Sequence, residues 1–181
     1  MQTLGFALLI CILNYISSSK SNLAVAKTIM IDSIADLILP ILSMLSVQVP
    51  RLDSILAQIQ LIIICTISIF FVVTKLRLQP EAEKTSLLGF GSMFISVLIT
   101  YYCMDLTSEM ASAGNSLSIA ATCTHFRIDL VAKVSMLAIS TTNMLRLPKR
   151  KFIVRVLDIM AMLAVLVMSS SNLVNFYRRP R

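Results

Sequence analysis

The chain has 181 residues, a net charge of +7 and a mean hydropathy of +0.85, with 57% hydrophobic and 14% charged residues. A soluble domain carries about 25% charged residues, so this composition argues against a soluble protein and indicates an integral membrane protein. The basic residues mostly flank hydrophobic runs and do not alternate with aromatic residues. We therefore expect no binding to nucleic acid.

Two apolar segments near the start are short or interrupted. Gly5 to Ile16 is apolar but short, and we expect a first membrane helix there, with an uncleaved signal-anchor or an interfacial segment as alternatives. Leu23 to Val49 is interrupted by Lys27, by two aspartates and by Pro40. The pattern predicts an amphipathic or partly inserted helix, with a kink at the proline.

The two aspartates of the second segment, Asp32 and Asp36, lie four residues apart and share one face of the expected helix. Because like charges at this spacing repel, we expect both carboxylates to face water, lipid headgroups or a cationic partner. In the alternative interpretation, they take part in the passage of cations or protons.

Two uncharged hydrophobic runs, Ile55–Thr74 and Ser86–Met104, dominate the centre of the chain. Each is long enough, as a helix, to cross the roughly 30 Å hydrocarbon core of a bilayer. The charged segment 75–85 joins them and contains Pro80 as a helix breaker. The pattern predicts an antiparallel, membrane-spanning helical hairpin, with Asp53 or Ser54 as the candidate N-cap of its first helix.

The segment 110–144 opens with small residues that recur every four positions. Ridges of this kind let helix backbones approach closely in lipid, where dispersion and weak hydrogen bonds drive association. We therefore predict a helix-packing face. Its members are Ser112, Gly114, Ser116, Ser118, Ala120 and Thr124.

The middle of the same segment carries charges. His125, Asp129 and Lys133 form one helical stripe, and Arg127 projects nearly opposite. A charge at a helix centre costs about 2.5–3.5 kcal/mol on insertion scales, so these groups need partners or headgroup depth. The competing hypothesis is a proton or ion relay through His125 and Asp129. The whole candidate polar network is Asp32, Asp36, His125, Arg127, Asp129 and Lys133.

The segment 146–155 is the densest basic stretch, and a third uncharged run, Ile159–Tyr177, follows it. We expect the basic residues to contact anionic lipid headgroups beside a membrane helix. The residues assigned to this contact are Lys149, Arg150, Lys151 and Arg155.

The distribution of basic residues also predicts an orientation. If segments 75–85 and 146–155 lie on one side of the membrane, the chain crosses an even number of times between them. Segment 110–144 must then span, Arg51 lies on the opposite side, and the three terminal arginines conflict with the charge rule.

No motif for chemistry is visible. The chain has one histidine, its four cysteines lack metal-ligand spacing, and there is no nucleophile elbow, phosphate loop or zinc motif. We therefore expect no enzymatic activity, no cofactor and no metal site.

These observations predict a single multi-pass membrane domain over residues 1–181, an all-α transmembrane bundle of four to six segments with short loops. The function we expect is structural: a small subunit of a larger membrane complex, or a laterally packed membrane protein of a virus particle. Its partners would be the lipid bilayer with anionic headgroups, and other membrane protein subunits or copies of itself. The alternative is a small channel or transporter subunit with a polar ion or proton pathway.

Overall fold

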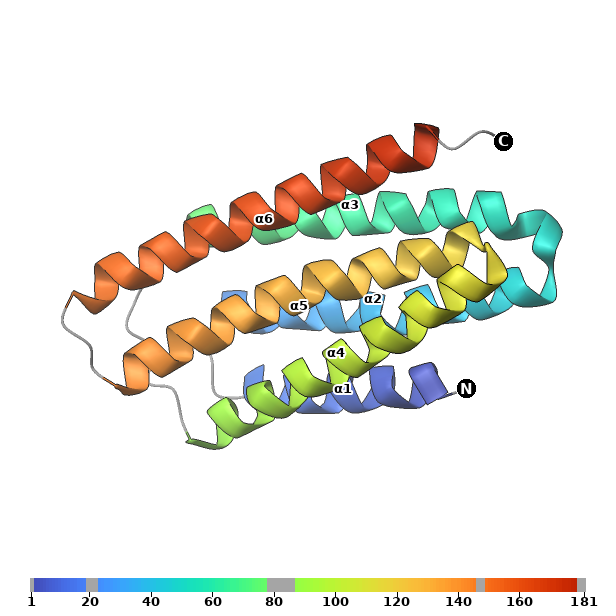
Figure 1. Cartoon of the computed structure of the whole chain (residues 1–181). Helices are drawn as coiled ribbons and strands as arrows, with labels where there is room; N and C mark the ends of the chain where they lie inside the picture. Colours follow the sequence, from blue (N-terminus) through green and yellow to red (C-terminus); the bar gives the residue numbers. More distant parts are fainter. Residues whose placement is uncertain (1, 19–22, 78–86, 146–148, 179–181) are drawn as a thin grey trace.

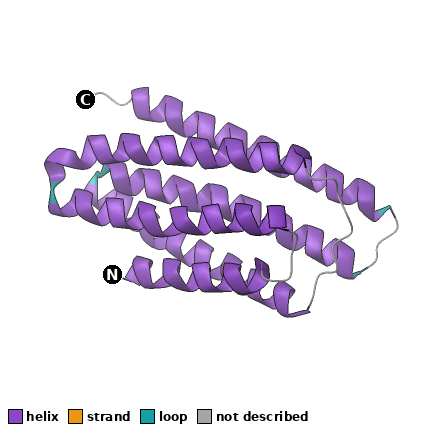
Figure 2. Cartoon of the chain, turned by 180° about the vertical axis from the view of Figure 1, so that it is seen from behind, coloured by secondary structure: helices purple, strands orange, loops and turns teal. Residues whose placement is uncertain are grey.

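A computed structural model shows which segments of the chain lie side by side. It describes the backbone of residues 2–18, 23–77, 87–145 and 149–178, and nearly every residue in these ranges is helical. Figure 2 shows helices joined by short turns, and no strand occurs in the described ranges. The all-α class predicted from the apolar runs is therefore confirmed.

Six α-helices make up the described part of the chain. Long uninterrupted helices are expected for these apolar runs, because a helix satisfies its backbone hydrogen bonds internally. The helices are α1 (Gln2–Ser18), α2 (Leu23–Gln48), α3 (Asp53–Arg77), α4 (Leu87–Gly114), α5 (Leu117–Met144) and α6 (Arg150–Arg178), with a 3-10 helix, η1 (Pro50–Leu52), before α3.

Successive helices run in opposite directions along one common axis (Figure 1). The end of α3 and the start of α6 consequently lie at the same end of the bundle, where α4 begins and α5 ends. These helix ends flank the basic segments 75–85 and 146–155. The turn that contains Arg51 lies at the opposite end, beside the start of α1 and the end of α6.

Helix α5 occupies the centre of the bundle. It packs against α2, α3, α4 and α6, whereas α1 packs against α2 and α4. Helices α3 and α4 run antiparallel, as predicted, and they share no contact between described residues. The physical reason is that lipid solvates the apolar sides of α3 and α4 as well as protein does, whereas the polar side chains of α5 need protein partners on several sides.

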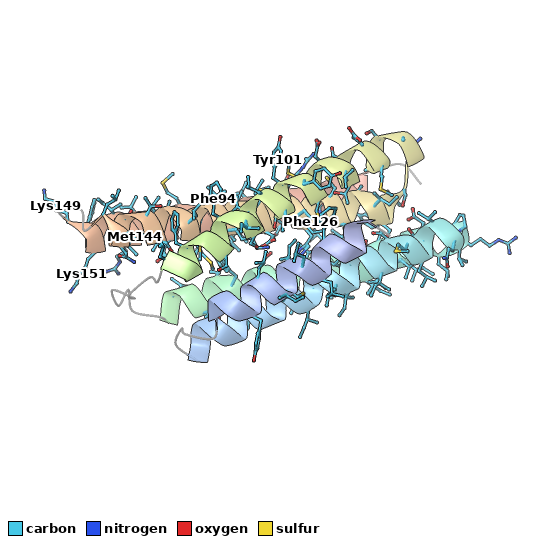
Figure 3. The ribbon with its side chains drawn as sticks, turned by 90° about the horizontal axis from the view of Figure 1, so that it is seen from below. Phe94, Tyr101, Phe126, Met144, Lys149 and Lys151 are labelled. Carbon is cyan, nitrogen blue, oxygen red and sulfur yellow. The ribbon has the colours of Figure 1, made fainter. Side chains whose placement is uncertain are left out.

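Two buried apolar clusters surround α5. The larger one joins α2, α3, α5 and α6, and the smaller one joins α1, α4 and α5. Phe126, which is fully buried, lies among the helices in Figure 3. The larger cluster contains Ala35, Leu39, Ile64, Phe71, Ile128, Met162 and Val165, and the smaller contains Ile10, Cys103 and Phe126.

The outside of the bundle is apolar over much of its length. Three described stretches, Pro50–Thr74, Phe90–Gly114 and Lys151–Val174, are helical, long and apolar enough to cross a membrane. Large apolar side chains on these helices are exposed, including Ile62 on α3 and Val167 on α6. The length and composition of these helices are compatible with an integral membrane protein.

The segment 110–144 forms parts of two helices and not one. Helix α4 continues to Gly114, and Asn115 then adopts a left-handed backbone with φ 48°, a conformation that asparagine tolerates. Ser116 is the N-cap of α5, and its hydroxyl accepts a hydrogen bond of 3.3 Å from a backbone N–H of the first turn. The small-residue pattern that begins at Ser112 therefore crosses a helix boundary, and the central helix is α5 alone.

Candidate functional site

Four ionisable side chains meet in the interior, about midway along α2 and α5, and form the charged cluster (Asp36, His125, Asp129 and Lys133). His125 Nε2 lies 3.0 Å from Asp36 Oδ1. Lys133 Nζ donates to Asp129 Oδ2 at 2.5 Å and lies 3.6 Å from Asp36 Oδ2. Thr100 of α4 accepts a hydrogen bond of 3.0 Å from Lys133 Nζ. The charged cluster therefore connects α2, α4 and α5.

The helical repeat explains how α5 builds its share of the charged cluster. His125, Asp129 and Lys133 are spaced by four residues, which places them one above the other on a single face. Asp36 reaches this face from α2, which packs against α5. The relative exposure of Asp36 is 0%, and that of Lys133 is 6%. Water therefore does not screen these charges, and each depends on its protein partners.

A second group of polar side chains, the Gln60 layer (Gln60, Ser43, Ser118 and Thr122), lies closer to the start of α5. Gln60 Nε2 donates to Leu39 O at 3.0 Å, to Ser43 Oγ at 3.1 Å and to Thr122 Oγ1 at 3.3 Å. Gln60 Oε1 accepts a bond of 3.0 Å from Ser118 Oγ. One amide thus joins α2, α3 and α5 inside the bundle.

Asp53 forms a third polar contact, at the end of the bundle that contains the turn between α4 and α5. Its carboxylate accepts hydrogen bonds from Ser116 Oγ at 2.7 Å, from Leu117 N at 2.8 Å and from Ser118 N at 3.1 Å. Backbone N–H groups at a helix start lack partners within the helix, and a carboxylate there also favours the helix dipole. Asp53 begins α3 but caps α5, in contrast to the expected cap on its own helix.

Helix α6 joins the interior through uncharged polar contacts. Ser68 Oγ and Ser169 Oγ lie 2.7 Å apart between α3 and α6. Thr124 Oγ1 donates a longer hydrogen bond of 3.4 Å to Asn172 Oδ1. These contacts are of the type that joins helices in lipid, where a hydroxyl without a partner would be unfavourable.

The structure brings together four of the six residues of the predicted polar network. Asp36, His125, Asp129 and Lys133 form the charged cluster. Arg127 is exposed, on the side of α5 away from the cluster. The side chain of Asp32 lies outside the described residues.

The predicted packing face is divided by the turn between α4 and α5. Ser112 and Gly114 are exposed at the end of α4, and a Cβ added at Gly114 would meet no atom within 4 Å. Within this chain no described helix covers these two residues, because α4 ends at Gly114, and a contact of this face with another protein stays a prediction. Ser118 is buried, while Ser116, Ala120 and Thr124 are partly buried on α5.

The predicted lipid-facing basic residues lie at the start of α6. Lys149, Lys151 and Arg155 are exposed, and Figure 3 shows Lys149 and Lys151 at one end of the bundle. The side chain of Arg150 lies outside the described residues. Contact of these residues with anionic headgroups stays a prediction.

The main residues that the sequence argument missed are uncharged. Gln60 lies inside a run that contains no charge, and Thr100 lies inside another. A glutamine in a membrane-length apolar run was the available signal, because its amide needs partners wherever lipid surrounds the helix. Ser43 offered no comparable signal, since serine can satisfy its hydroxyl on its own helix.

The charged cluster, the Gln60 layer and the Asp53 contact all join one helix to another, so their chemistry favours helix association. No group of three or more His, Cys, Asp or Glu side chains in the described part of the chain is arranged to hold a metal ion. Comparisons of the chain with protein-family models, with curated proteins and with solved structures give no match. The internal contacts are therefore the basis for a functional hypothesis.

We predict that Asp53→Ala destabilises the bundle by about 1–2 kcal/mol, because it removes a charged cap from the start of α5. Unfolding of the purified protein by sodium dodecyl sulfate in mixed micelles measures the change. Asp105→Ala is the matched control, since Asp105 is an exposed carboxylate on α4. Equal effects of the two substitutions would contradict the role assigned to Asp53.

Proposed function

We propose that this chain is a non-enzymatic, multi-pass membrane protein with a structural role, either as a small subunit of a larger membrane complex or as a laterally packed membrane protein of a virus particle. The observation that carries the proposal is the mutual pairing of Asp36, His125, Asp129 and Lys133 inside the bundle. Charges that satisfy one another between helices hold those helices in register.

The distribution of apolar surface supports the same role. Exposed apolar side chains such as Ile62, Leu98 and Val167 suit lipid or the surface of a neighbouring membrane protein. The connections described between α2 and α3 and between α4 and α5 are only a few residues long, which leaves no room there for an additional domain. Contact within the membrane is therefore the activity that this surface favours.

The proposed topology has α3, α4, α5 and α6 crossing the membrane. The composition of α5 is too polar to identify it as a membrane span. However, α5 connects the last residue of α4, at one end of the bundle, to the first residue of α6, at the other end. If α4 and α6 cross the membrane, α5 must therefore cross it too. The basic residues near the start of α6 then contact anionic headgroups on the same side as the connection between α3 and α4.

We predict that cysteines placed at Leu76 and Lys149 react from one side of the membrane, and cysteines at Arg51 and Asn115 from the other. All four positions are exposed and lie at helix ends. The measurement is labelling of sealed vesicles with a membrane-impermeant maleimide, in a chain whose native cysteines are replaced by alanine. Labelling of Leu76→Cys and Lys149→Cys from opposite sides would overturn the topology.

The structural role is tested by photo-crosslinking in the native membrane. A photoreactive amino acid is placed at Ile62, Leu98 or Val167 on the outer surface, with the buried Ile64 as the control position. We expect discrete protein products from at least one outer position and none between chains from Ile64. Absence of protein products from all three outer positions would overturn the assembly role.

A channel or transporter subunit is the second candidate, and one observation favours it. Polar side chains follow α5 from the Asp53 contact, through the Gln60 layer, to Lys133 in the charged cluster. Under this hypothesis, liposomes that contain the protein show proton or cation flux, and Asp129→Asn abolishes the flux while the fold remains intact. Under the structural hypothesis, the flux equals that of protein-free liposomes.

A further inference from the structure

Two charged side chains lie on the outside of the bundle, away from the helix ends. Arg127 of α5 and Asp105 of α4 are exposed, and among the described exposed side chains they are the charged ones that lie more than about two turns inside a helix. Neither has a hydrogen bond or an ion pair within the described part of the chain. In the proposed topology both helices cross the membrane, where lipid tails offer a charge no partner.

The contacts of nearby residues show the direction in which Arg127 projects. Cys123 Sγ donates to Met104 O of α4 at 3.8 Å, and Thr124 of α5 contacts Asn172 of α6. Arg127 follows Cys123 by four positions and Thr124 by three, so it shares the side of α5 that lies between α4 and α6. Figure 1 shows α5 between these two helices, with α2 behind it. Arg127 is therefore on the outer side of the bundle.

Asp105 lies on the outer side of α4 at nearly the same depth as Arg127. Tyr101, one turn away on the same face of α4, is exposed and points outward in Figure 3. Asp105 comes nine residues before Gly114, the end of α4, and Arg127 comes ten residues after Leu117, the start of α5. At 1.5 Å per residue, they lie about 14 and 15 Å from the turn that joins the two helices. The outer face of α4 and α5 thus carries an anion and a cation at matching depth.

We propose that this face binds a second copy of the chain, with Arg127 of each copy paired to Asp105 of the other. A two-fold axis along the membrane normal leaves the depth of every residue unchanged and places α5 of one copy opposite α4 of the other. Two identical ion pairs then form together, and the exposed ring of Tyr101 is available to stack on the incoming guanidinium. The inference rests on the proposed structural role and names the surface and the partner for it.

The test is energy transfer between labelled copies in phosphatidylcholine vesicles. Donor and acceptor dyes are attached at Lys149→Cys, in a chain whose native cysteines are replaced by alanine. We expect transfer above the level of random encounter, and association at least about tenfold weaker with Asp105→Arg or Arg127→Asp, because each reversal places like charges opposite one another. Arg155→Asp, at an exposed position of α6 near the other end of the bundle, is the matched control and should leave the transfer unchanged.

A mixture of the two variants tests the arrangement itself. Asp105→Arg protein and Arg127→Asp protein should each fail to self-associate but should pair with one another, because one ion pair of the mixed dimer is unaltered and the other is reversed. Both side chains are exposed, so neither substitution removes a described contact within one chain. Unfolding by sodium dodecyl sulfate checks that each variant is folded, and the measurement on the chain without these substitutions needs no variant.

Several results would overturn the proposal. These are transfer no greater than random encounter in the chain without charge reversals, unchanged transfer in both single variants, and recovery only when both reversals are in the same chain, which would indicate a pair within one molecule. Photo-crosslinks from the outer positions to other proteins, without energy transfer between copies, would overturn self-association and leave the structural role intact. Absence of both signals would overturn the structural role as well.

Discussion

Lys133→Met is expected to destabilise the bundle by about 3–5 kcal/mol, because it leaves two buried carboxylates with only His125 to compensate them. Asp129→Asn should cost less, since Lys133 keeps Asp36 as a counter-ion at 3.6 Å. The double variant should recover much of the loss, because Asp36 and His125 remain as a pair. The free energy of unfolding of the two single variants and the double variant, measured in bicelles, gives the coupling directly.

The control for this cycle lies on the same helix. Arg127→Met removes one cation from α5 at an exposed position, and we expect little change in the free energy of unfolding. If Arg127→Met and Lys133→Met have equal effects, the loss of a buried ion pair is not the cause. If the effects of Asp129→Asn and Lys133→Met are additive, the two side chains are not coupled.

The second large effect is expected at Gln60. Gln60→Leu removes the four hydrogen bonds of one amide to α2 and α5 and leaves hydroxyl groups and a carbonyl to find other partners. Hydrogen bonds between membrane helices contribute on average about 0.6 kcal/mol each, so the loss should be about 2 kcal/mol.

The same helix provides the control for Gln60. Gln58→Leu makes the same chemical change two residues earlier, at a partly buried position on another face of α3. We expect the Gln58→Leu protein to unfold within about 0.5 kcal/mol of the unaltered chain. A larger loss at Gln58 than at Gln60 would show that the apolar packing of α3, and not the amide, determines its stability.

The positions of the helices could be predicted from the sequence, but the contacts between them could not. Uncharged runs of membrane length have one stable backbone conformation in lipid, so the helices α3, α4 and α6 could be predicted from composition. The composition does not predict which of these helices pack against one another, because lipid solvates an apolar side chain equally well on every side of a helix. The absence of contact between α3 and α4 in the described residues is an example, since neither helix needs the other to cover its apolar side chains.

Some residues of the candidate site could likewise be predicted from the sequence, and others could not. The spacing of His125, Asp129 and Lys133 predicted a shared face, since the helical period determines it. The fourth member, Asp36, comes from a helix whose position relative to α5 no local pattern determines. Gln60 and Thr100 were missed because a single neutral polar residue changes the hydropathy of a long run very little.

The position of α5 in the chain has a consequence for biosynthesis. Ribosomes synthesise the chain from its N-terminus, so α2, α3 and α4 are made before α5. Asp36, Gln60 and Thr100 are therefore already available when α5, the central helix, leaves the ribosome. A nascent chain that stops before α5 would contain these groups without their partners, which makes it a candidate substrate for quality control in the membrane.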